Sequence, residues 1–163
     1  MTTRVLKGIL PCDAPDLIGR LSDERSFPAY APEILRVDAM GDDLHQWTLA
    51  FRCGTARWVQ RSRSDQGAQR IDFEQVEGDF QQFAGSWTCA DTPEGCEAAF
   101  ELRFRTSVPH LAGAIDSAVG RVLTRCAHQI LAGHGGRVRV TSGQHLLWDP
   151  VYEHTTERPT DAL

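Results

Sequence analysis

The chain has 163 residues, of which 41% are hydrophobic and 24% charged, and its formal net charge is −5. This composition is typical of a soluble globular domain and excludes a disordered chain, a collagen-like repeat and a small disulfide-rich scaffold. The negative charge argues against nucleic acid as a partner, because proteins bind the phosphate backbone mainly through positive charge. We expect residues 1–150 to form one domain and residues 151–163 a polar tail.

The N-terminal sequence MTTRVLKGILP has no long apolar run, so it predicts neither a signal peptide nor a membrane span. The five cysteines show no CxxC spacing, which argues against a metal site and favours reduced thiols in a cytoplasmic protein. Cys89 and Cys96 flank a turn-rich segment and could face each other across a hairpin. A disulfide between them stays open as an alternative.

The first elements are expected to be a strand, a short helix and a turn. A strand is predicted over Arg4–Leu10. A helix follows at about residues 14–22, with Asp13 as a plausible N-cap. The passage from Phe27 to Pro32 contains two prolines, which exclude a long helix there.

From Ile34 to Phe104 the sequence alternates between apolar and polar residues, as half-buried strands do. Turn-forming residues interrupt this alternation at 41–43, 65–67 and 93–95. The pattern predicts an antiparallel meander with one apolar face. The apolar face includes Trp47, Trp58, Phe73, Phe83 and Trp87.

The spacing of the apolar residues changes after Pro109, from every second residue to the spacing of a helix. Apolar residues from Leu111 to Leu131 recur at helical spacing, which predicts one long amphipathic helix over about residues 109–133. Residues 137–141 alternate again and could add an edge strand. We therefore expect an α+β fold in which an antiparallel sheet wraps around a long C-terminal helix.

Two segments carry a resemblance to a known family. The stretch EGDFQQFAGSW (77–87) and the strand that follows it (95–104) resemble the polyketide cyclase/dehydratase group of the START/Bet v 1-like superfamily. With the order of elements, the resemblance covers about residues 4–134. It implies the helix-grip fold and an internal cavity for a hydrophobic ligand, whereas the activity depends on the site.

A third segment, Trp58 to Asp65, resembles a strand of the tetracenomycin-type aromatase/cyclases. In that family a tryptophan is followed four residues later by an arginine proposed to act on the substrate. Here Ser62 occupies that place, and Arg61 and Arg63 flank it. A regular strand points Ser62 into the cavity and both arginines outward, whereas a bulge would turn one arginine inward. Tyr30 loosely matches the family's loop tyrosine.

The candidate site follows from these patterns and the resemblance. The apolar residues above are predicted to line the cavity, although plain core packing explains them equally well. The other candidates are polar, since a polar residue in register with inward-facing ones needs a partner. The predicted catalytic residues are Tyr30, Ser62 and His110, and the predicted substrate-binding residues are His45, Trp47, Trp58, Gln60, Arg61, Arg63, Phe73, Gln75, Phe83 and Trp87. We expect neither a metal nor a cofactor.

The resemblance implies three alternative functions. The first is an enzyme that folds a poly-β-ketone or polyene intermediate for regioselective cyclisation and dehydration, with the substrate free or tethered to an acyl carrier protein. The second is a carrier of lipid or quinone with no chemistry. The third is a self-resistance protein that sequesters a natural product. We expect a monomer or a homodimer in each case.

Overall fold

The structure is a computed structural model that describes residues 1–52, 54–107 and 112–147. It has the α+β architecture that the sequence predicts. The elements in chain order are β1 (Thr2–Leu10), α1 (Ala14–Leu21), the 3₁₀ helix η1 (Glu24–Ala29), β2 (Ile34–Ala39), β3 (Leu44–Phe51), β4 (Gly54–Asp65), β5 (Arg70–Gly78), β6 (Phe80–Thr92), β7 (Gly95–Thr106), α2 (Ala112–Gly135), β8 (Arg139–Ser142) and the 3₁₀ helix η3 (Gln144–Leu146).

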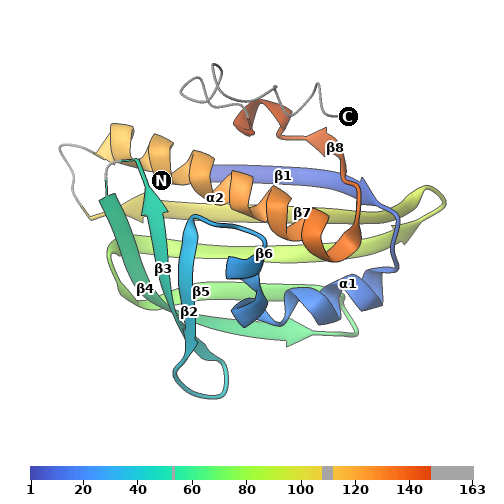
Figure 1. Ribbon diagram of the computed structural model, residues 1–163, viewed down its shortest axis with the longest axis horizontal. Helices are drawn as coiled ribbons and strands as arrows, with labels where there is room; N and C mark the ends of the chain where they lie inside the picture. Colours follow the sequence, from blue (N-terminus) through green and yellow to red (C-terminus); the bar gives the residue numbers. More distant parts are fainter. Residues whose placement is uncertain (53, 108–111, 148–163) are drawn as a thin grey trace.

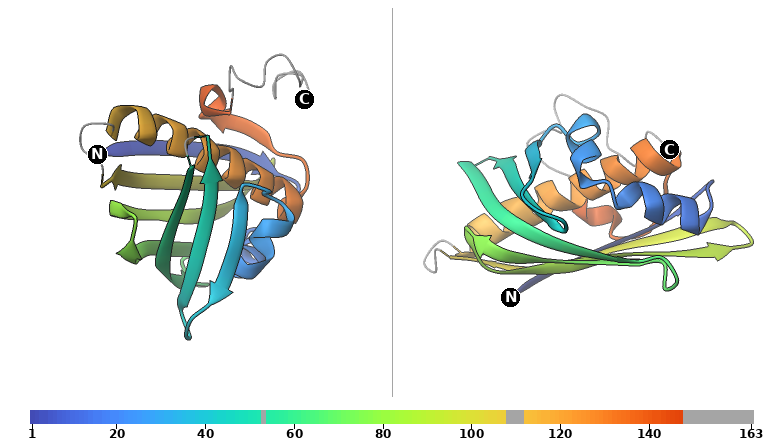
Figure 2. Two further views of the ribbon diagram at one scale, coloured as in Figure 1. Left: turned by 60° about the vertical axis from the view of Figure 1, so that its left-hand side comes forward. Right: turned by 90° about the horizontal axis from the view of Figure 1, so that it is seen from below.

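The eight strands form one sheet with the order β2-β3-β4-β5-β6-β7-β1-β8. The sheet is curved, and α2 runs across its inner face (Figure 1). Figure 2 shows that α1 and η1 lie on the same side of the sheet as α2. This arrangement confirms the helix-grip prediction and leaves the opposite face of the sheet to solvent.

The core lies between the sheet and α2. The helix buries an apolar stripe at the spacing that the sequence shows, and it packs mainly against β1 and β7 and, to a smaller extent, β3. The buried residues of the stripe are Val119, Val122, Leu123, Cys126, Ala127, Ile130 and Leu131. The two faces together bury most of the apolar side chains, so the position of α2 defines the space left inside the fold.

The element boundaries agree with the sequence predictions to within a few residues. The predicted edge strand exists as β8, which pairs antiparallel with β1. Helix α2 ends at Gly135, which with Gly133 is one of the two glycines that the sequence favours as its end. The expected start of this helix at Pro109 lies outside the described residues, as does the predicted tail. Asp13 occupies the N-cap position of α1, as predicted, but its side chain makes no cap hydrogen bond, and the Asp91 carboxylate accepts the Ala14 N–H at 2.8 Å.

Strand β4 is regular, as predicted, and the bulge lies on its partner β5. Val59 pairs with Glu77 and Gln60 with Gln75, so Val76 is the extra residue and is 48% exposed. Because β4 keeps its alternation, its even-numbered side chains point inward and the arginines outward.

The cysteines of the described chain are free thiols. Cys89 and Cys96 form no disulfide. Burial raises the pKa of Cys12 to about 11 and that of Cys126 to about 12, so both thiols stay protonated at neutral pH. This state is typical of structural rather than reactive cysteines.

Candidate functional site

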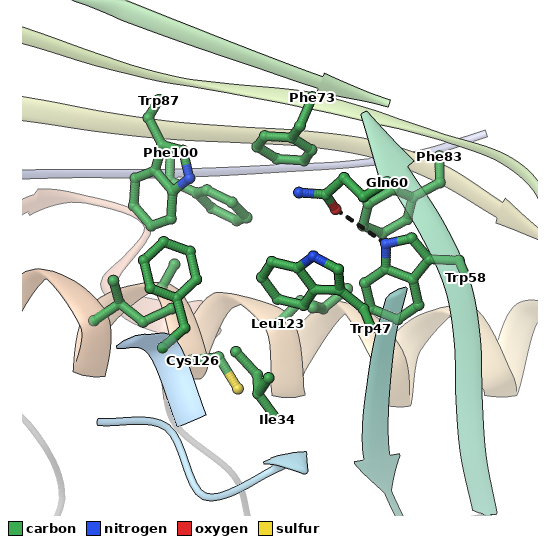
Figure 3. A pocket seen from close by; sticks show the side chains of 13 residues that line it. Ile34, Trp47, Trp58, Gln60, Phe73, Phe83, Trp87, Phe100, Leu123 and Cys126 are labelled. Atoms are coloured by element: carbon green, nitrogen blue, oxygen red, sulfur yellow. Dashed lines mark hydrogen bonds between the residues drawn. The ribbon is translucent and has the colours of Figure 1, made fainter. Parts of the chain in front are cut away.

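A cavity lies between the inner face of the sheet, α2 and η1 (Figure 3). It is small: the space inside it is about 30 Å³, room for only a few water molecules. Ligand sites usually have about 300–1,000 Å³, so the walls must move apart to admit a ligand. The lining residues are Phe27, Ile34, Trp47, Trp58, Gln60, Phe73, Phe83, Trp87, Phe100, Leu123, Cys126, Ala127 and Ile130.

Aromatic rings form most of the cavity wall. Trp47 of β3 stacks on Trp58 of β4, with ring centroids 5.5 Å apart and planes 19° from parallel. Across the cavity, Phe100 stacks on Phe73 and packs against Trp87. The rings come from neighbouring strands in register, so the alternation of the sheet places them on one face. Flat, apolar walls of this kind suit a planar ligand.

One corner of the cavity is polar and is centred on Gln60. Its carbonyl oxygen Oε1 accepts a hydrogen bond from the Trp58 indole N–H at 3.0 Å. Its amino group donates to Glu24 Oε1 at 2.6 Å and to Ser62 Oγ at 3.3 Å. Ser62 Oγ in turn donates to the same Glu24 oxygen. The hydrogen bonds therefore join a cavity wall to a carboxyl group on η1.

Glu24 is the acidic group of this corner and is 5% exposed. Burial raises its pKa, while hydrogen bonds from Ser62 and Gln60 and the charge of His45 lower it in part. His45 Nδ1 of β3 lies 2.8 Å from Glu24 Oε2, and its side chain is 17% exposed. The Trp47 N–H also faces the carboxyl group and lowers its pKa, without completing a hydrogen bond. The carboxyl group thus lies between the cavity and a partly exposed imidazole.

The structure brings most of the predicted site residues together. Six of the predicted substrate-binding residues line the cavity, and two more predicted residues, His45 and Ser62, contact Glu24 directly behind it. Ser62 points inward, as a regular strand requires. The six lining residues are Trp47, Trp58, Gln60, Phe73, Phe83 and Trp87.

Tyr30 does not reach the cavity. It follows η1 and is 39% exposed, and its ring lies against the backbone of α2 at Gly133, where any Cβ would come within 2.2 Å of it. The ring also meets His134 edge-on with centroids 4.7 Å apart. The glycine gives the ring a place on the outside of the helix, which is why this tyrosine faces away from the ligand space.

Three other predicted residues also lie elsewhere. The side-chain amide of Gln75 is bonded to the backbone of Phe80: its nitrogen donates to the Phe80 carbonyl oxygen at 2.8 Å, and its oxygen accepts from the Phe80 N–H at 3.1 Å. Arg61 pairs with Asp43 at 3.6 Å, and Arg63 is exposed. Both arginines border a hollow on the outer face of the sheet. His110 lies outside the described residues.

Glu24 was missed by sequence reasoning. It sits in the irregular passage between α1 and β2, where no period distinguishes an inward residue from an outward one. The acidic residues around it, Asp23 and Glu33, gave no reason to single it out. Strand β4 did carry a signal. Its inward polar residues Gln60 and Ser62 required a buried partner, and Glu24 is that partner.

Within the described residues, no group of three histidine, cysteine or acidic side chains is placed to hold a metal ion. The described helices include none that is long and apolar enough to cross a membrane.

Comparison with known proteins decides the family. The model of the family described as "Polyketide cyclase / dehydrase and lipid transport" matches residues 19–130. The chain belongs to this family. The match includes η1, β2 to β7 and most of α2, and therefore the whole cavity wall. No curated protein matches the sequence closely enough to count as a relative.

Solved structures support the same fold. A protein of Thermus thermophilus is 18% identical, with a TM-score of 0.71, and the alignment covers 82% of this chain and 94% of that one. The Zhui aromatase/cyclase from a Streptomyces species is 12% identical, with a TM-score of 0.68 and coverage of 82% and 92%. A START superfamily protein from Mycobacterium smegmatis is 12% identical, with a TM-score of 0.67 and coverage of 82% and 95%.

Proposed function

We propose that this protein is a cofactor-independent cyclase that folds a poly-β-ketone in its cavity and guides ring closure and loss of water. The observation that carries the proposal is the aromatic cavity with a buried carboxyl group at its one polar corner. Such a cavity accelerates one ring closure over others by holding the chain in a reactive conformation. The substrate in this proposal is tethered to an acyl carrier protein, and the product is released from the carrier only after cyclisation.

In this proposal Glu24 moves the protons. It lies immediately behind Gln60, and a ligand that opens the cavity comes within its reach. Burial raises its pKa, which brings the carboxyl group closer to the pH at which it both takes and returns a proton. For ring closure, the carboxylate takes a proton from the carbon next to one ketone, the resulting enolate carbon forms the C–C bond to the carbonyl carbon of a second ketone, and Glu24 returns the proton to that oxygen, which becomes a hydroxyl group. For loss of water, the carboxylate takes the remaining proton from the same carbon, and the C=C bond forms as the hydroxyl group leaves. Glu24 gives this proton to the leaving hydroxyl group, so that water departs and the carboxylate is restored.

Ser62 and His45 support this group. Ser62 donates a hydrogen bond to Glu24 and stabilises the ionised form. His45 is partly exposed and connects the carboxyl group to solvent. The predicted catalytic role of Ser62 therefore becomes that of a hydrogen-bond donor to Glu24 in this proposal.

A second candidate, a lipid or quinone carrier, is favoured by one observation. Gln60 is the one amide or charged side chain among the described residues that line the cavity, and an apolar cavity suits a ligand that is only held. The family description also includes lipid transport. The two candidates differ in whether the bound molecule leaves changed.

The test supplies a poly-β-ketone on an acyl carrier protein and analyses the products with and without this protein. A cyclase yields one aromatic product in place of the mixture that forms spontaneously. Glu24→Gln keeps the shape of the side chain and is expected to lower turnover about 10²–10⁴-fold. Arg103→Ala, on the outer face, is the matched control and leaves the products as in the wild type. An unchanged mixture with the wild-type protein would contradict the cyclase and favour the carrier.

A further inference from the structure

The chemistry of its neighbours fixes the orientation of the Gln60 amide. Its oxygen faces the Trp58 N–H, which can only donate, and its nitrogen faces Glu24 Oε1, which accepts. If the amide were turned over, its amino group would face the Trp58 N–H, donor against donor, and its oxygen would face Glu24 Oε1, acceptor against acceptor.

This orientation does not depend on the charge of Glu24. Oε1 accepts hydrogen bonds from both Gln60 and Ser62. When Glu24 is protonated, the proton sits on Oε2, which faces His45 Nδ1 at 2.8 Å. Both hydrogens of the Gln60 amino group are used in either state. What Gln60 can offer the cavity is the second lone pair of its carbonyl oxygen, an acceptor.

A donor lies in the same corner. The Trp47 side chain is 6% exposed and lines the cavity, and its indole N–H has no hydrogen-bond partner. Figure 3 shows the nitrogen on the edge of the ring that faces the Gln60 amide, and both side chains act on the Glu24 carboxyl group. This N–H faces the Glu24 carboxyl group without completing a hydrogen bond. Because buried donors seldom stay unpaired in native proteins, it can donate to an acceptor atom of a ligand that enters the cavity.

We propose that Gln60 and Trp47 select ligands that place a phenol or enol hydroxyl group in this corner. This inference rests on the proposed function and narrows its substrate class to enolised or phenolic forms. A hydroxyl group donates to the Gln60 carbonyl oxygen and accepts from the Trp47 N–H, so it satisfies both. A ketone or methyl ether accepts from Trp47 but leaves its oxygen against the Gln60 oxygen. Glu24 and Trp58 are positioning residues that hold the amide.

The test compares two probes of nearly the same shape, 1-naphthol and 1-methoxynaphthalene, by calorimetric titration of the full chain. We expect the wild type to bind the naphthol about tenfold more tightly, the effect of one additional hydrogen bond. Gln60→Met removes the acceptor and keeps the length, so the ratio should fall towards one. A wild-type ratio near one, with both probes bound, would overturn the proposal and leave the cavity as a binding site.

A pair of Glu24 variants and one control on the cavity wall separate selection from folding. Glu24→Gln retains an oxygen that accepts from Gln60 and Ser62 and should keep the naphthol preference, although it is expected to lose turnover. Glu24→Met removes the oxygen and should lower the preference. Phe83→Leu is the matched wall control, which weakens both probes equally and leaves the ratio unchanged. If Gln60→Met does not fold, the wild-type ratio and the Glu24 pair still decide the question.

Two further outcomes of the titrations would contradict the proposal. A preference that survives in Gln60→Met overturns the assignment of Gln60. Failure of the wild type to bind either probe contradicts the proposed function of the cavity. It then also contradicts the selection of hydroxyl groups by Gln60 and Trp47.

Discussion

The carboxyl group of Glu24 connects η1 to the neighbouring strands β3 and β4. It lies on η1 and contacts Gln60 and Ser62 of β4 and His45 of β3. A buried acid is costly unless its neighbours donate hydrogen bonds to it, and here they do. These contacts also hold η1 against the sheet.

Glu24 is expected to make stability depend on pH. Its ordinary pKa of 4.5 is raised in the folded protein, mainly by burial. The folded state therefore keeps a proton that the unfolded chain releases above about pH 4.5. The free energy of unfolding falls as pH rises from about 4.5 through the raised pKa, by about 1.4 kcal/mol for each unit of separation.

Urea unfolding of the wild type and Glu24→Gln between pH 4 and pH 8 measures this dependence. The glutamine does not titrate, so the stability of the variant relative to the wild type should increase with pH across that window. A difference that stays constant, or that changes in the opposite direction, would show that the pKa of Glu24 is not raised.

At the residue scale, prediction from sequence was limited by irregular backbone. Inward residues on strands were found because alternation assigns each side chain to a face, as for Trp58, Gln60 and Ser62. Glu24 and Tyr30 lie in or beside a 3₁₀ segment with no such period, and their directions depend on tertiary contacts. The ring of Tyr30, for example, follows the bare backbone of Gly133.

At the scale of elements, the close approach of β5 to β4 positions the cavity wall. Gly78 ends β5 with a φ of 150°, and a Cβ there would lie 2.5 Å from the Trp58 backbone. The absence of a side chain at this position lets β5 pass close to the backbone of Trp58, whose ring forms part of the cavity wall. The sequence resemblance included Gly78, but its contact with Trp58 depends on the strand register, which the pattern alone does not give.

Gly78→Ala is expected to lower the free energy of unfolding by about 1–3 kcal/mol, because it adds both backbone strain and a clash. The matched control is Gly19→Ala on α1, where nothing lies within 4 Å of the added Cβ. That change should stabilise the protein by about 0.5–1 kcal/mol, since alanine favours helix. Thermal and urea unfolding measure both, and equal effects at the two sites would contradict the account of β5.

At the scale of the whole molecule, the sheet and α2 enclose a space filled largely by the protein's own aromatic rings. The order of elements and the two hydrophobic periods predicted this arrangement, because a half-apolar sheet and an amphipathic helix must cover each other. The size of the cavity could not be predicted in this way, since it depends on how the side chains of Phe27, Trp47 and Trp87 pack.

We expect a planar ligand to bind between the sheet and α2. The most direct measurement is a crystal structure of the protein with 1-naphthol. Our account predicts the rings among Trp47, Phe73 and Trp87, the hydroxyl group beside Gln60, and a cavity larger than 30 Å³. Naphthol bound elsewhere, such as in the outer-face hollow bordered by Arg61 and Arg103, with the inner cavity still closed, would contradict it.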